Sequence, residues 1–341
     1  MTLRVAALCA LVLATGACGP RPPSAGERPD AEPLVWPGPP AEPRIRYVMS
    51  LSSPPDVGVE KSFFGRVTDA LFGRAEEFLI RPTGVAEHEG VLYVADPGAQ
   101  AVWIFDTVNR KFAKVAKIGP TALISPVAVA PASDGAVFVA DTWLKIVVML
   151  ARDGRFLRPV ATEGLERPAA LAYDAQSDRL YVADSAAHRV VVYRADGTRV
   201  FGWGTRGSGD GEFNYPTHLA LDRLGTLLVT DALNFRVQAF DRDGHFLWRM
   251  GEHGDGSGNV ASPKGVAADN IGHLYLVDAL YDAVQIFDRD RGFLLSFGGR
   301  GVKPGEFWLP SGIFVNGRDR IYVADSYNQR VQVFELLPAA D

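Results

Sequence analysis

The sequence predicts an all-β fold, a six-bladed β-propeller, because three landmarks recur together six times along the chain. An aspartate closes a short apolar run at intervals of 43 to 47 residues. A large hydrophobic residue follows each aspartate by nine residues, and a proline precedes it by 14 to 16 residues. A period in the forties with about four short strands per unit is typical of propeller blades, which bury their faces only against neighbouring blades. The six aspartates are Asp96, Asp141, Asp184, Asp231, Asp278 and Asp325.

Each repeat predicts a meander of short strands. In the last repeat, the apolar runs 312–315, 321–324 and 331–334 alternate with polar turns rich in Asn and Asp, which is the expected pattern for tightly connected strands. The first run of each repeat is rich in Gly and Ala, as in residues 127–130 and 265–268. We expect these small residues where the blades converge on a central axis.

This pattern resembles the NHL-repeat family of β-propellers over about residues 82–337. Residues 216–251 and the last repeat are most similar to the family unit, whereas the second repeat has Leu144 and Ile146 where the family has Asn and Arg. The resemblance implies a six-bladed propeller and leaves the activity open, because one fold hosts many functions.

The first 18 residues are predicted to be an export signal. Arg4 precedes the apolar run Val5–Leu13, and small residues lead up to Cys18. The segment resembles a bacterial lipoprotein signal, which implies lipidation of Cys18 and a membrane-anchored protein facing the periplasm or the cell exterior. The alternative is ordinary cleavage near Ala17 that leaves Cys18 free. Cys9 and Cys18 are the only two cysteines, so we expect no disulfide in the mature chain.

Three segments are expected between the signal and the first blade. Residues 19–43 are Pro-rich and predict a disordered tether. Residues 44–51 alternate in polarity and predict a strand that completes the last blade, within a propeller domain spanning 44–337. Residues 52–81 predict a short helical insertion, with Ser62 as the helix N-cap and an apolar face that includes Phe63 and Phe72.

The net charge of the chain limits the kinds of partner that it is expected to bind. A net charge of −5 and a pI near 5.7 argue against a nucleic-acid surface, which needs clustered Lys and Arg. We expect no nucleic-acid partner. The chain is expected to be a monomer without a cofactor that binds an envelope protein or a small ligand. Its lipid anchor is expected to be its only contact with the membrane.

The predicted binding face carries the loops between the second and third strands and the linkers between blades. The repeat aspartates are interpreted as structural caps for these loops. Departures from the repeat predict an apolar sector on blades 2 and 5, beside a polar sector on blades 3, 4 and 6. The candidate binding residues are Trp143, Leu144, His188, Arg189, His218, Asn234, Tyr281, Tyr327 and Asn328.

The favoured function is an envelope-anchored binding scaffold rather than an enzyme. The alternative is a metal-dependent lyase or a lactonase-like hydrolase on the same face. Peptidyl-α-hydroxyglycine lyases are related propellers that hold a metal with histidines from different blades, and the resemblance makes His188, His218 and His253 the candidate ligands in this chain. These histidines do not occupy that family's motif position.

Overall fold

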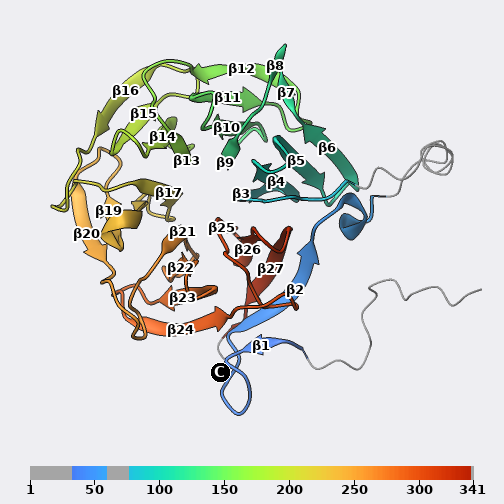
Figure 1. Cartoon of the computed structure of the whole chain (residues 1–341), viewed down its shortest axis with the longest axis vertical. Coiled ribbons are helices and arrows are strands. Elements are labelled where there is room, and N and C mark those ends of the chain that lie inside the picture. The colour runs from blue at the N-terminus through green and yellow to red at the C-terminus, as the bar shows by residue number, and fades with distance from the viewer. Residues whose placement is uncertain (1–32, 60–76, 339–341) are drawn as a thin grey trace, which may run out of the picture. The chain divides into compact units, whose positions relative to one another are not determined.

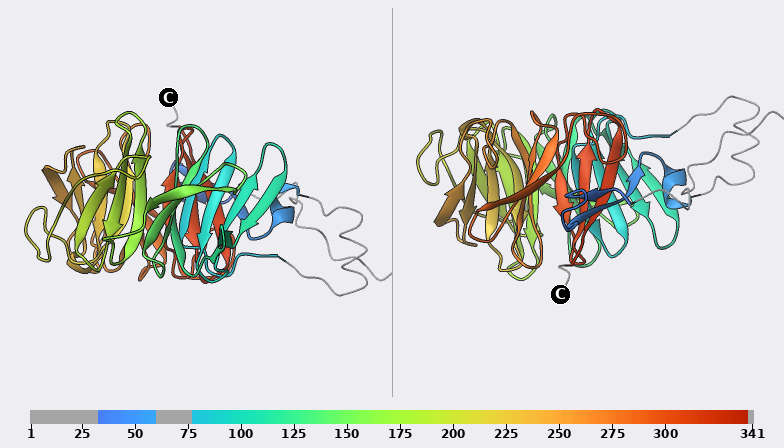
Figure 2. Two further views of the ribbon diagram at one scale, coloured as in Figure 1. Left: turned by 90° about the horizontal axis from the view of Figure 1, so that it is seen from above. Right: turned by 90° about the horizontal axis from the view of Figure 1, so that it is seen from below.

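The propeller occupies the described part of the chain. The computed structural model describes residues 33–59 and 77–338. Six antiparallel sheets stand radially around a central axis (Figures 1 and 2), as the sequence predicts. The export signal, Cys18 and the helix expected at 62–73 lie outside the described residues.

Blades 1 to 3 each contain four strands, which follow one another from the axis outwards. Blade 1 consists of β3 (Gly84–His88), β4 (Val91–Asp96), β5 (Ala101–Asp106) and β6 (Lys111–Val115). A small hairpin of β7 (Lys117–Ile118) and β8 (Thr121–Ala122) follows it. Blade 2 consists of β9 (Pro126–Pro131), β10 (Val137–Asp141), β11 (Ile146–Leu150) and β12 (Phe156–Ala161). Blade 3 consists of β13 (Pro168–Asp174), β14 (Arg179–Asp184), β15 (Arg189–Tyr193) and β16 (Arg199–Trp203).

Blades 4 and 5 repeat this order, and blade 6 is built from both ends of the described chain. Blade 4 consists of β17 (Pro216–Leu221), β18 (Leu227–Asp231), β19 (Arg236–Phe240) and β20 (Phe246–Met250), with the 3-10 turn η2 (Ala232–Asn234) after β18. Blade 5 consists of β21 (Pro263–Ala268), β22 (Leu274–Asp278), β23 (Ala283–Phe287) and β24 (Phe293–Gly298). Blade 6 consists of β25 (Ile313–Val315), β26 (Arg320–Asp325), β27 (Arg330–Leu336), β2 (Ile45–Leu51) and β1 (Val35–Trp36).

The N-terminal strand closes the ring, as the sequence predicts. Strand β2 pairs antiparallel with β27, with Ile45 opposite Leu336 and Leu51 opposite Val331. The 3-10 turn η1 (Pro54–Val57) follows it. Of the tether expected over 19–43, residues 19–32 lie outside the described residues, whereas Val35 and Trp36 form β1 against β2. The Trp36 ring packs against that of Phe334, with 5.8 Å between ring centroids, and this aromatic contact stabilises β1.

The hydrophobic core is divided among the interfaces between adjacent blades. Each of the six main clusters draws its residues from two neighbouring blades. One of them joins blade 6 to blade 1 and contains Trp103, Phe105 and Val333, all nearly inaccessible to solvent. Each blade is therefore stabilised only by its neighbours, which makes closure of the ring important for stability.

The inner strands approach closely where blade 6 meets blade 1. A Cβ atom added to Gly312 would lie 2.3 Å from the Thr83 carbonyl oxygen, which is far inside contact distance. The Ser326 hydroxyl donates a 2.6 Å hydrogen bond to the Pro82 carbonyl across the same junction. The small residues of the innermost strands are thus required by the convergence of the blades.

The loops gather at two ends of the propeller (Figure 2). We call the end with the loops between second and third strands, together with the linkers between blades, the upper face, and the opposite end the lower face. No helix in the described residues has the length and hydrophobicity needed to cross a membrane.

Candidate functional site

The six repeat aspartates on the upper face are buried and bind backbone N–H groups. Each is at most 1% exposed. Asp96 accepts hydrogen bonds from the N–H groups of Ile80 and Arg81 in the segment that precedes its blade, at 2.7 and 2.9 Å. The other five aspartates also bind the linker that precedes their blade. The interpretation of these residues as structural caps is confirmed.

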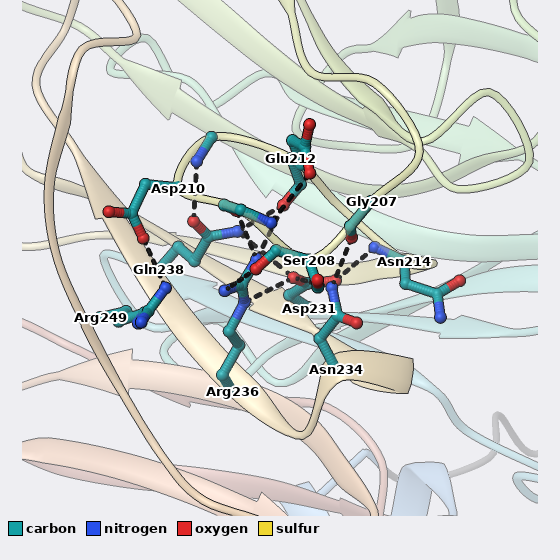
Figure 3. Close-up of polar contacts among 12 residues, drawn as sticks. Gly207, Ser208, Asp210, Glu212, Asn214, Asp231, Asn234, Arg236, Gln238 and Arg249 are labelled. Atoms are coloured by element: carbon teal, nitrogen blue, oxygen red, sulfur yellow. Dashed lines mark hydrogen bonds and ion pairs between the residues drawn. The ribbon is translucent and has the colours of Figure 1, made fainter.

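In blade 4, a buried arginine fastens the preceding linker to its aspartate (Figure 3). Arg236 donates from Nε to Asp231 Oδ2 at 2.8 Å. Its two terminal nitrogens donate to the carbonyls of Ser208, Gly209 and Glu212 at 2.7 to 3.0 Å. Gln238 adds a 2.7 Å bond from Nε2 to the Glu212 carbonyl. This network fixes the linker 204–215 and engages all three nitrogens of the guanidinium.

Three of the predicted binding residues belong to such networks. Asn234 donates from Nδ2 to the Gly207 carbonyl and to Asp231, both at 2.8 Å. Asn328 makes the equivalent bonds in blade 6. Arg189 binds Asp184 and the Gly164 carbonyl. These polar side chains hold the loops in place, so their amide and guanidinium groups are already engaged.

The apolar residues predicted on the upper face divide into exposed and covered side chains. Trp143 is 71% exposed and Tyr327 is 50% exposed. Leu144, in contrast, packs against the core between blades 1 and 2. Tyr281 is 37% exposed, and its hydroxyl donates to the Gly254 carbonyl at 2.7 Å.

Sequence reasoning missed several exposed apolar residues of this face, including Trp308, Leu233 and Val302. Trp308, in the linker before blade 6, is 42% exposed and lies against Tyr327 with 5.8 Å between ring centroids. Leu233, in η2, is 55% exposed. Both stand near landmark residues, but positions in loops and linkers have no alternating pattern that would indicate exposure. We call Trp143, Leu233, Leu280, Trp308 and Tyr327 the apolar rim.

The three histidines proposed as metal ligands have separate environments. His188 accepts a 3.3 Å hydrogen bond at Nδ1 from the Tyr215 N–H. His253 lies against Phe235, with 4.2 Å between ring centroids. His218 lines the central channel. The described residues contain no group of three or more His, Cys, Asp or Glu side chains that could hold a metal ion, so the structure does not assemble these imidazoles into a ligand set.

The central channel is a cavity of about 850 Å³ lined by the inner strands. Arg167, Thr217, His218 and Lys264 lie at its upper end, where the inner strands of blades 3, 4 and 5 begin. The two carboxylates in its lining, Glu87 and Glu89, lie at the opposite end of β3. Sequence reasoning missed Arg167 and Lys264, although their places directly before or after a blade-opening proline could have indicated them.

His218 is uncharged at neutral pH. Burial lowers its pKa to about 4, and a hydrogen bond to the backbone of Ile313 opposes this shift. An uncharged imidazole can donate or accept a hydrogen bond in the channel without adding charge. The upper mouth therefore combines two cationic side chains with neutral polar groups.

Comparisons with known proteins agree with the repeat pattern. The family model described as "NHL repeat" matches residues 165–193 and 307–334. The E3 ubiquitin-protein ligase NHLRC1 of Rattus norvegicus is 31% identical over 128 residues, which are 36% of this chain. The match spans only 32% of the length of that relative.

Solved propellers are similar in fold at low sequence identity. A Bacteroides thetaiotaomicron protein of unknown function has a TM-score of 0.61 and 16% identity, with 77% of this chain and 71% of that chain covered. Virginiamycin B lyase from Staphylococcus aureus has a TM-score of 0.56 and 13% identity, with 75% and 95% covered. At these identities the similarity establishes the fold alone. The chain is a six-bladed β-propeller that contains NHL repeats at residues 165–193 and 307–334.

Proposed function

We propose that the protein is an envelope-anchored scaffold that binds another envelope protein through the upper face of its propeller. The observation that carries this proposal is the apolar rim. Its side chains project from loops that the buried aspartates hold rigidly, and exposed aromatic residues on a rigid framework are frequent anchors of protein interfaces. The neighbouring Asn234, Arg236 and Asn328 side chains are engaged in the framework, so the exposed apolar side chains are the proposed contact groups.

An exposed apolar residue on the lower face, outside the apolar rim, serves as a control. Leu224, in the turn between β17 and β18, is 70% exposed, almost the same as Trp143 at 71%. A photo-crosslinking amino acid placed at 143 is expected to form a specific adduct in cells, whereas the same group at 224 is expected to form none. Equal adducts at the two positions, or none at 143, would contradict a partner surface on the upper face.

The membrane anchor is a separate part of the proposal and is carried by the lipoprotein-like signal that ends at Cys18. Replacing Cys18 by Ser removes the thiol that would receive the lipid, so the protein should move from the membrane fraction to the soluble fraction of the envelope. Labelling with a fatty-acid analogue gives a second measurement. An unlabelled wild-type protein would argue for ordinary cleavage near Ala17.

A further inference from the structure

The upper mouth of the channel has cationic and hydroxyl groups without protein partners. Among the described residues, the Lys264 side chain forms no ion pair or hydrogen bond, and no carboxylate lines this end of the channel. The Thr217 hydroxyl oxygen is buried and also lacks a partner. Buried polar atoms are normally hydrogen-bonded, so an unpartnered one facing a cavity indicates a group that a ligand or water satisfies.

These groups come from three consecutive blades and share one side of the mouth. Arg167 precedes β13, Thr217 lies in β17 and Lys264 lies in β21, and the inner strands of these blades are in contact. The Arg167 guanidinium lies over the Tyr215 ring, 5.8 Å from its centroid. That contact restricts the side chain without neutralising its charge.

Below the mouth many of the residues that line the channel are small and apolar, with polar surface between them. The lining includes Ala128, Ala170, Ala220 and Ala267, whose side chains also pack into the core between blades. The lower end carries both signs of charge, from Glu87, Glu89 and Arg318. A volume of about 850 Å³ lies within the range of roughly 300–1,000 Å³ that is usual for small-molecule sites.

We propose that the channel is a binding site for a small amphipathic anion. Its carboxylate or phosphate group lies at the upper mouth against Lys264, Thr217 and Arg167, and its apolar part lies along the alanine-lined wall. A cavity with a cationic end and apolar lining residues favours a ligand that has both an anionic group and an apolar chain. A ligand with only one of these parts would leave either the cationic groups or the apolar lining without a matching contact. The site does not depend on the apolar rim and remains testable if no protein partner binds there.

Calorimetric titration of the full-length protein with octanoate, octyl phosphate, octanol and acetate tests the proposal. At least one of the two octyl anions is expected to bind about 10-fold or more tightly than octanol, which lacks the charge, and than acetate, which lacks the chain. Tighter binding of octanoate identifies a carboxylate site, and tighter binding of octyl phosphate identifies a phosphate site. Absence of binding by both anions, or equal binding of octanol, would overturn the proposal.

Matched variants locate the site. Lys264→Ala is expected to weaken binding of the anion about 10-fold and Thr217→Val a few-fold. Lys117→Ala, at an exposed lysine of β7 outside the channel, should leave the affinity unchanged. The His218 ring signals should shift on titration while those of His273, which does not line the channel, stay in place. Unchanged affinity in a folded Lys264→Ala variant would show that the anion binds elsewhere and that the assignment is incorrect.

Discussion

Arg236 and Asp231 form a buried ion pair that ties the linker before blade 4 to its sheet, with 2.8 Å between Nε and Oδ2. The Arg236 side chain is 7% exposed and that of Asp231 is 0% exposed. The equivalent pair in blade 3, Arg189 and Asp184, has an arginine that is 31% exposed. The same repeat position thus occurs in a buried and a solvated setting within one molecule.

Arg236→Ala is predicted to lower the free energy of unfolding by about 3–5 kcal/mol, because it leaves a buried carboxylate without its counter-ion and the linker carbonyls without donors. Arg189→Ala is the matched comparison and should cost less, because the Arg189 guanidinium is 31% exposed and donates to one linker carbonyl rather than to three, although this change also leaves a buried carboxylate. Urea denaturation of the two variants measures the difference. Equal losses would show that burial does not set the strength of the pair.

The repeat predicts this framework but not the burial of its arginines. Both arginines stand five residues after their aspartate, so sequence position does not separate them. The linker before blade 4 spans residues 204–215, whereas that before blade 3 spans only 162–167. A longer linker supplies more carbonyls to surround the guanidinium, and its path depends on tertiary packing that a repeat pattern does not encode.

The candidate site is less predictable than the fold for a related reason. Closure by residues 44–51 follows from a missing strand, and the capping role of the aspartates follows from their regular recurrence. The exposure of Trp143 beside the covered Leu144 depends instead on how one turn is oriented, because the two residues are adjacent in sequence. Lys264 stands directly after a blade-opening proline, but its lack of an ion-pair partner at the upper mouth follows only from the tertiary structure.

Two truncations test the closing strands separately. A chain starting at Asp56 loses β1 and β2, which uncovers Phe334 and the edge of β27, and its melting temperature should fall by roughly 10 °C or more. A chain starting at Arg44 keeps β2 and loses only Trp36 and its neighbours, so a smaller decrease is expected. Thermal unfolding followed by circular dichroism compares them. If the chain starting at Asp56 melts at the same temperature as the chain starting at Arg44, β2 does not stabilise the propeller by closing the ring.

His218, which is half-buried in the channel, is expected to make the protein less stable in mild acid. Its folded-state pKa of about 4 lies below the unfolded value of about 6.5, so the unfolded state binds more protons between these two pH values. The stability that His218 contributes is present above pH 6.5 and is lost as pH falls toward 4, with a slope of at most about 1.4 kcal/mol per pH unit. Urea denaturation of the wild type and His218→Gln between pH 4.5 and 7 measures it. A difference between the two proteins that is independent of pH would contradict a half-buried neutral imidazole.

His273 should show the opposite dependence on pH. Its Nδ1 lies 2.8 Å from Asp269 Oδ2, and this hydrogen bond raises the pKa of His273 against the effect of burial. A raised pKa means that the folded state holds the proton more tightly, so the added stability is complete below about pH 6.5 and is lost as pH rises through the folded-state pKa. His273→Ala should therefore lower the melting temperature more at pH 5.5 than at pH 8.5. His245 is the matched control, because it makes the same 2.8 Å contact with Asp241 but its side chain is 78% exposed, against 26% for His273. Since solvent weakens exposed pairs, the decrease in melting temperature caused by His245→Ala should differ much less between pH 5.5 and pH 8.5. A difference as large as that of His273→Ala would show that burial of the pair does not cause the pH dependence.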